Sequence, residues 1–220
     1  MRLKVLVEGQ SEEAFVNRVL GPHLHHFEVW PVAFIVYTSR KRGARGGVTG
    51  FERIRRDLRR LMREDRNADV RFTSMFDLYR FPSDLPGMDS IAERDPYRRV
   101  DQVQAAFEKT IVEELDDNRF LPYLQLHEFE ALIMAEPARL SHVYPARRKE
   151  IEGLEASLRH FESPEHVNLD DPPSKRIERA VPEYGKVAAA AQVTGAIGLD
   201  AIRAKCRHFH DWLTRIEALG

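Results

Sequence analysis

The chain has 220 residues, of which 43% are hydrophobic and 31% charged, so it can form a folded core and is not a disordered tail. Lys and Arg number 34 against 35 Asp and Glu, a net charge of -1, which excludes a polybasic protein but not a local nucleic-acid groove. The single cysteine, Cys206, excludes a disulfide scaffold and a multi-cysteine zinc site. No apolar run approaches the roughly 18 residues that span a bilayer, and no signal-peptide segment is visible, so we expect a cytoplasmic protein.

The first 135 residues alternate strand-like and helix-like patterns. Short runs rich in Val, Leu and Phe predict strands over residues 3–7, 29–37, 69–76 and 121–127. Apolar residues at helical spacing predict one helix that starts near Ser11 and stops at Gly21-Pro22, and two more over residues 51–66 and 100–115. Pro31 places the second strand toward an edge of the sheet. This alternation predicts an α/β fold, with a mostly parallel four-stranded sheet flanked by helices.

After Ala135 the strand signal fades and helical patterns separated by proline-marked loops follow. We therefore expect an α/β domain over residues 1–135 and a helical C-terminal extension over residues 136–220. No linker separates the two parts, so the extension is expected to pack on the sheet as a single compact unit.

Acidic residues follow three of the four predicted strands. Glu8 ends the first strand, Asp77 the third, and Glu128 and Glu130 follow the fourth. Each acid alone is more often an ordinary loop or cap residue. As a set they meet at the carboxyl edge of a parallel sheet, where open α/β folds bind ligands. Carboxylate oxygens suit Mg²⁺ or Mn²⁺, so the set predicts a metal site.

Glu8 differs from the acids that follow it. Glu12 and Glu13 fall in a first helical turn, where the helix dipole favours acids without any functional role. An acid that ends a buried strand has no such reason to be there, because its burial costs free energy unless something pairs with it.

These segments resemble a known family. The stretch Leu3-Lys-Val-Leu-Val-Glu-Gly-Gln-Ser-Glu-Glu-Ala-Phe resembles the first motif of Toprim domains, the metal-dependent modules of topoisomerases, primases and overcoming-lysogenization-defect (OLD) nucleases. The whole chain more closely resembles a bacterial Toprim-like family known as domain of unknown function 4276. The supporting segments are Met75-Phe-Asp-Leu-Tyr-Arg-Phe-Pro-Ser-Asp-Leu-Pro-Gly, Tyr123-Leu-Gln-Leu-His-Glu-Phe-Glu-Ala-Leu, Pro173-Ser-Lys-Arg-Ile, and Ile197-Gly-Leu with Cys206-Arg-His-Phe-His-Asp-Trp-Leu.

The resemblance implies roles for individual residues. Glu8 matches the invariant Toprim glutamate, Glu12 an additional acid of OLD-type nucleases, and Asp77 the first aspartate of the Asp-x-Asp pair. Tyr79 stands where the second aspartate is expected, which puts a standard two-metal site in doubt; Asp84 is a candidate replacement. Glu128 or Glu130 would supply the late ligand.

Basic residues offer contacts to a phosphodiester. In the nuclease interpretation, Lys175 would stabilise transition-state charge and Arg176 would grip a phosphate, although a lysine in a proline-bounded loop is more often simply solvated. The predicted helix over residues 51–66 carries seven arginines, which form either a solvated face or a surface that binds a nucleic-acid backbone. We assign to nucleic-acid binding the residues Arg42, Arg45, Arg56, Arg59, Arg63 and Arg176.

Together these observations predict a Toprim-like, Mg²⁺- or Mn²⁺-dependent nuclease or phosphodiesterase with Glu8, Asp77 and Lys175 as catalytic residues. The resemblance further implies a separate ATPase partner and a role in phage defence. A homo-oligomer is a further candidate arrangement, which the resemblance does not address. The rival hypothesis is a catalytically silent partner or sensor subunit that keeps the Toprim fold, and the Tyr79 substitution favours it.

Overall fold

A computed structural model of the protein describes residues 1–36, 50–85, 87–88, 92–167 and 170–220. Its centre is a sheet in which every strand pair is parallel, with the order β2-β1-β3-β4 and β5 also paired to β3. The strands are β1 (Arg2–Val7), β2 (Trp30–Ile35), β3 (Val70–Asp77), β4 (Phe120–Leu121) and β5 (Leu124–Gln125). The predicted α/β class is confirmed, and β2 lies at the edge, as Pro31 indicated.

The predicted fourth strand is broken in two. Pro122 has no N–H to donate to a ladder, so pairing with β3 stops between β4 and β5. The Ser74 hydroxyl bridges the gap, because its Oγ accepts from the Tyr123 N–H and donates to the Tyr123 carbonyl, both at 3.1 Å. Within the described ranges the sheet therefore has five strands rather than the predicted four.

Between β1 and β2 the chain is continuously helical from Gln10 to His25. It runs through α1 (Gln10–Phe15), a π-helical turn (Val16–Leu20) and α2 (Gly21–His25), so the predicted stop at Gly21-Pro22 is wrong. The wider turn ahead of Pro22 accommodates its missing N–H and its ring. Gly21 donates to the Val16 carbonyl, and a Cβ at this position would lie 3.1 Å from that oxygen.

The remaining helices complete the layers. Two long helices lie between strands in the sequence: α3 (Phe51–Glu64) precedes β3, and α4 (Pro96–Leu115) precedes β4. After the sheet come α5 (Arg148–Ser157), α6 (Pro173–Ala180), α7 (Lys186–Ile197), α8 (Leu199–Lys205) and α9 (Arg207–Glu217). Short 3-10 turns cover Leu78–Arg80, Phe129–Ala131, Ile133–Ala135, Pro137–His142, Pro145–Arg147 and Pro164–His166. No helix of the described residues is long and apolar enough to cross a membrane.

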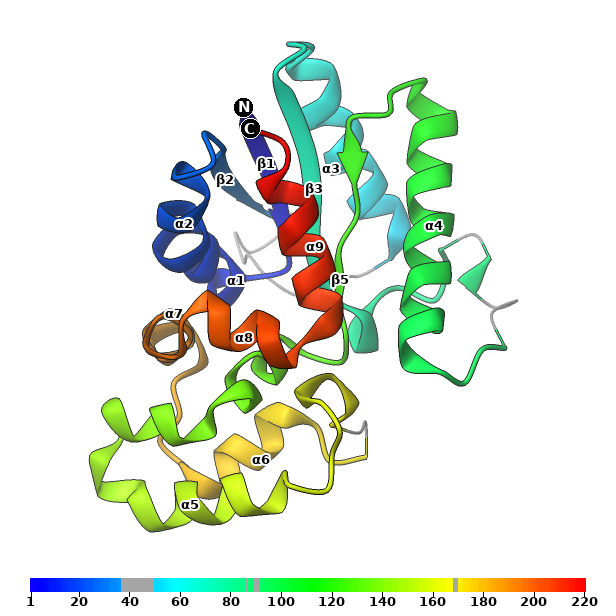
Figure 1. Ribbon diagram of the computed structural model, residues 1–220. Helices are drawn as coiled ribbons and strands as arrows, with labels where there is room; N and C mark the ends of the chain where they lie inside the picture. Colours follow the sequence, from blue (N-terminus) through cyan, green and yellow to red (C-terminus); the bar gives the residue numbers. More distant parts are fainter. Residues whose placement is uncertain (37–49, 86, 89–91, 168–169) are drawn as a thin grey trace, which may run out of the picture.

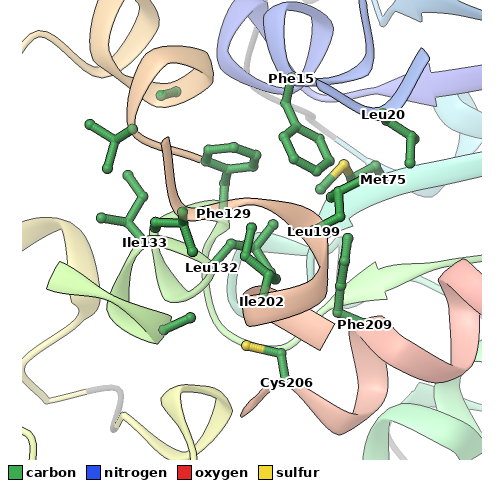
Figure 2. Packing of buried hydrophobic residues seen from close by; sticks show 14 of the residues in the cluster. Phe15, Leu20, Met75, Phe129, Leu132, Ile133, Leu199, Ile202, Cys206 and Phe209 are labelled. Carbon is green, nitrogen blue, oxygen red and sulfur yellow. The ribbon is translucent and has the colours of Figure 1, made fainter. Parts of the chain in front are cut away.

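Two hydrophobic clusters pack on opposite faces of the sheet. On one face Leu6 and Phe72 meet the apolar sides of α3 and α4. On the other face Leu3, Val5 and Val7 meet α1 together with the C-terminal helices. Figure 1 shows α9 lying across this second face, and Figure 2 shows side chains of the shared cluster around the chain that follows β5. Residues before and after position 135 therefore share one core.

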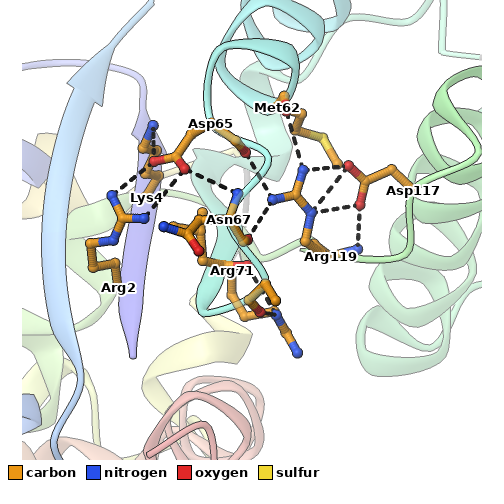
Figure 3. Close-up of polar contacts among 10 residues, drawn as sticks. Arg2, Lys4, Met62, Asp65, Asn67, Arg71, Asp117 and Arg119 are labelled. Carbon is orange, nitrogen blue, oxygen red and sulfur yellow. Dashed lines mark hydrogen bonds and ion pairs between the residues drawn. The ribbon is translucent and has the colours of Figure 1, made fainter.

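The amino edge of the sheet is held by a polar network (Figure 3). Arg119 donates to the carbonyls of Met62 at 3.1 Å and Asp65 at 2.8 Å, which are backbone acceptors at the end of α3, and pairs with Asp117 at 2.6 Å. The Asp65 carboxylate pairs with Lys4 of β1 at 3.0 Å, and this contact is the main cause of its lowered pKa. These contacts fix α3 to β1 at the end of the sheet opposite the predicted site.

Candidate metal centre at the carboxyl edge of the sheet

Three strand ends bring the predicted acids to one edge. Val7 pairs with Met75, so Glu8 follows β1 beside the last residues of β3, which ends at Asp77. Asp77 pairs in turn with Gln125 of β5, three residues before Glu128. Residues that are about 120 positions apart in the sequence thus reach the same edge because the strands are parallel and adjacent.

The first turn of α1 adds Glu12 to this group. Glu12 is buried, and the Glu13 N–H bonds to the Gly9 carbonyl at 3.1 Å, which starts the helix directly after the strand. The first helical residue is Gln10, and Gly9 rather than Ser11 is the N-cap. A Cβ on Gly9 would lie 3.3 Å from a carboxylate oxygen of Glu12, so glycine leaves room for this carboxylate at the end of β1.

Glu128 and Glu130 are buried on either side of Phe129, in the tight turn after β5. The Glu128 carboxylate accepts the backbone N–H of Ser174 at 3.0 Å, in the first turn of α6. Glu130 pairs with Lys186 at 3.4 Å, at the start of α7. The ring of Phe129 packs edge-on against Phe15 of α1 at 5.5 Å, so the turn is anchored to the helix that carries Glu12 (Figure 2).

The acids interact strongly with one another. Burial raises the pKa of Asp77 well above its ordinary value, and the charges of Glu12, Glu8, Glu130 and Glu128 raise it further. Burial is also the main cause that raises the pKa of Glu12 to about 7, with smaller effects of Glu8 and Glu130. The pKa of Glu130 is raised by burial too, against the opposing charge of Lys186. Five carboxyl groups therefore share one electrostatic environment in which full ionisation is unfavourable.

The donor set is compatible with a hard divalent cation. It consists of carboxylate oxygens, the ligand type that Mg²⁺ and Mn²⁺ prefer. As oriented, no three His, Cys, Asp or Glu side chains of the described ranges could hold a metal ion, so a shared ion requires side-chain rotation. The buried hydroxyl of Tyr184 has no hydrogen-bond partner, and its pKa is raised by burial and then by Glu130. This phenol is therefore a buried hydrogen-bonding group that is available to a ligand of the acidic centre.

Two predicted contributors have partners outside the group of acids, and Tyr79, which stands where an acid was expected, lies on another surface. Lys175 is exposed on α6 and pairs with Glu178 at 2.6 Å. Asp84 accepts the Phe51 N–H at 2.8 Å and so caps α3, which accounts for its place in the loop. Tyr79 is 49% exposed and lines a separate cavity. Among the residues that the structure describes, Lys186 forms an ion pair with one of the acids, Glu130.

The predicted nucleic-acid contacts fall into three groups. Arg59 pairs with Glu114 of α4, and Arg176 is held by Asp171 at 3.2 Å and stacks over Phe161 at 5.2 Å, so both guanidinium groups are engaged within the protein. Arg56 and Arg63 are exposed on α3. Arg42 and Arg45 lie outside the described residues.

Sequence reasoning missed Ser174, Tyr184 and Lys186. Tyr184-Gly185-Lys186 follows no motif, and these residues join the acids only because α6 and α7 lie beyond the carboxyl ends of the strands (Figure 1). Ser174 belongs to the segment that resembles the family, but it contributes its backbone N–H. Almost every residue type has this group, so the identity of the residue could not predict the contact.

Fold and site together define an α/β domain with a parallel sheet and an acidic centre at its carboxyl edge. The sequence matches the family "Domain of unknown function (DUF4276)" over residues 7–217, so the chain belongs to this family, and the predicted membership is confirmed. No curated protein matches the chain.

Solved structures similar to this one include C-terminal regions of two OLD proteins. That of Burkholderia pseudomallei is 14% identical, with 100% of this chain and 98% of that chain covered and a TM-score of 0.45. That of Xanthomonas campestris pv. campestris is 18% identical, with 97% of this chain and 94% of that chain covered and a TM-score of 0.41.

Proposed function

We propose that the protein is a Mg²⁺- or Mn²⁺-dependent phosphodiesterase that acts on nucleic acid. The observation that supports this proposal best is the group of five carboxyl groups, Glu8, Glu12, Asp77, Glu128 and Glu130, at the carboxyl edge of the sheet. Such a concentration of acids, of which Glu12, Glu128 and Glu130 are buried and Glu8 and Asp77 half-buried, is unfavourable without a cation and is therefore expected to serve one.

The residues would divide the work as follows. Glu8 and Asp77, with Glu12 and one of Glu128 and Glu130, would hold the metal, which when bound activates water and screens the phosphate charge. Lys186, whose Nζ lies 3.4 Å from Glu130, would bring positive charge to the phosphate in place of Lys175. The Tyr184 hydroxyl would orient a water molecule, since it is buried without a partner.

Glu8→Gln tests this proposal. We expect cleavage of labelled DNA or RNA in Mn²⁺ to fall by at least about 100-fold, because a neutral amide binds the cation poorly. The matched control is Glu13→Gln, which changes the neighbouring acid of α1 outside the group and should retain activity. Cleavage by Glu8→Gln at the parental rate would show that the metal site is assigned wrongly.

The exposed arginines of α3 and its C-terminal end are the proposed backbone contact. Replacing Arg56, Arg63 and Arg66, all exposed, by Glu is expected to weaken nucleic-acid binding and to lower its dependence on salt. Removing one phosphate contact reduces the slope of log K against log salt by about 0.9 for duplex DNA. The measurement is a titration of labelled duplex at several salt concentrations.

A second triple variant controls for overall charge. Arg148, Arg159 and Arg215 are also exposed but lie on other helices or just beyond them. Their replacement by Glu changes the net charge by the same amount and should leave the salt slope unchanged. If both triple variants weaken binding equally, the α3 face is not the contact surface.

The rival function is a silent sensor or partner subunit, favoured by Tyr79 in place of an acid. In that case Mn²⁺ would leave the unfolding temperature unchanged, whereas a metal present at 100 times its Kd stabilises a protein by about 2.7 kcal/mol. The ATPase partner, the defence role, a homo-oligomer and the cytoplasmic location stay predictions from the sequence.

A further inference from the structure

A cavity of about 700 Å³ lies next to the acidic centre and takes no part in it. Its volume is within the range of about 300–1,000 Å³ that is usual for small-molecule pockets. Two connections tie it to the acids: Leu78 directly follows Asp77, and His127 directly precedes Glu128, and both residues line the cavity. The Tyr79 N–H bonds to the His127 carbonyl at 3.4 Å and joins these two walls.

The backbone at His127 separates the two sites. Its φ of 66° lies in the left-handed region, which non-glycine residues rarely adopt. This turn lets His127 line the cavity while Glu128, the next residue, reaches the N–H of Ser174. A ligand in the cavity would thus contact the sequence neighbours of two proposed metal ligands, Asp77 and Glu128.

The lining of the cavity suits a flat, neutral, aromatic group. Its floor is apolar, with Phe81 and Leu126 buried, and Tyr79 offers an aromatic ring that is 49% exposed. The rim carries groups of both signs, with Arg94 and Arg99 balanced by Asp95 and Asp170, together with the imidazoles of His127 and His166. Such a rim can hydrogen-bond the edge of a nucleobase, whereas an anion would favour a rim of positive charge only.

We infer that this cavity binds one unstacked nucleobase of the substrate, stacked on Tyr79, while the adjoining phosphate lies at the acidic centre. The substrate class is then single-stranded nucleic acid, or a duplex end whose last base is unpaired. This inference rests on the proposed function and specifies its substrate. It also gives Tyr79, which stands where an acid was expected, a role in binding the substrate.

The test uses a short single-stranded oligonucleotide with one 2-aminopurine, whose fluorescence falls when the base stacks. Binding is measured in EDTA, so that cleavage plays no part. The wild-type protein and Tyr79→Phe are expected to quench the probe and bind it alike. Tyr79→Ala is expected to bind about 10-fold more weakly with little quenching, because this loss lies within the range that stacking of one base on an aromatic ring contributes.

Two controls make the outcome decisive. Trp30→Ala removes an aromatic side chain of comparable exposure (47%) on the edge strand β2 and should bind as the wild type does. A fully paired, blunt duplex of the same sequence should bind more weakly than the single strand. Thermal unfolding of Tyr79→Ala checks that the half-exposed side chain is not needed for folding.

Equal binding by Tyr79→Ala and wild type, or no binding of the single strand, would overturn the inference. The proposed function is judged separately by the Glu8-dependent cleavage described above. If the protein cleaves duplex in a Glu8-dependent manner but does not bind the unpaired base, the proposed function stands and the inference about the cavity is wrong.

Discussion

Glu12→Gln is expected to make the metal-free protein more stable than the wild type at about pH 7.5, by on the order of 3 kcal/mol. The reason is the cost of ionising a buried carboxyl group beside other acids. The pKa of Glu12 rises from 4.5 to about 7 in the folded protein, chiefly through burial and then through Glu8 and Glu130. The substituted glutamine would keep the shape of the side chain and remove this charge.

The sign follows from where the proton is bound. Because the folded-state pKa lies above the unfolded value, the folded protein retains a proton that the unfolded chain has lost. The contribution of Glu12 to stability is therefore complete below about pH 4.5 and is lost as the pH rises through about 7. His127 and His208, whose pKa values are lowered by burial, act in the opposite direction. They are present in both proteins, so their effect cancels in the difference.

Denaturant titrations of both proteins at several pH values in EDTA measure this difference. Stability of the wild type should fall relative to Glu12→Gln as the pH rises, and Mn²⁺ should reverse the loss, since a cation favours ionised carboxylates. Glu13→Gln, the adjacent acid of α1, should follow the wild type. Parallel pH curves for the wild type and Glu12→Gln would show that Glu12 is not held in a destabilising acidic group.

Phe129→Ala is expected to cost about 3–5 kcal/mol of stability, the usual range for a buried Phe. Phe129 is only 2% exposed, contacts Phe15 edge-on, and lies between Glu128 and Glu130 in the turn after β5. The cavity left behind would loosen the turn that positions both acids, so metal-induced stabilisation should fall as well. Urea unfolding with and without Mn²⁺ measures both effects.

Phe27→Ala is the control for this change. Phe27 is 40% exposed just after α2 and lies outside the turn that carries the two acids. Its replacement should cost less and should leave the response to Mn²⁺ intact. A Phe129→Ala protein that unfolds at the wild-type urea concentration would contradict the packing described for this turn.

Much of the sheet could be predicted from the sequence because its signals are local. The Val- and Leu-rich runs of β1 and β3 and the acids that follow them are visible as short patterns, and parallel topology then brings Glu8 and Asp77 together. The break in the last strand depends on whether the Ser74 hydroxyl can replace a backbone partner at Pro122. That contact spans 49 residues and leaves no trace in a local pattern.

Charges are harder to predict, because their partners are distant in sequence. The sequence suggests that Arg59 is free to bind phosphate, yet Glu114 of α4, 55 residues later, pairs with it. Asp84 is a candidate ligand by sequence, but it caps a helix that begins 33 residues earlier. A charged side chain has no preferred partner until the fold brings one within reach, so composition along one helix cannot show which arginines remain exposed.

The hydrogen bond between Glu128 and the Ser174 N–H bears on how this protein can be divided. A fragment ending at residue 135 would contain all five carboxyl groups, yet it would lack Ser174, Tyr184 and Lys186, and the helix α9 whose Trp212 donates to Thr73 of β3. Such a fragment would expose the acids without the groups that neutralise and orient them. We therefore expect the smallest unit that carries the acidic centre to extend from β1 to α9, because the C-terminal helices are as much a part of the site as the sheet.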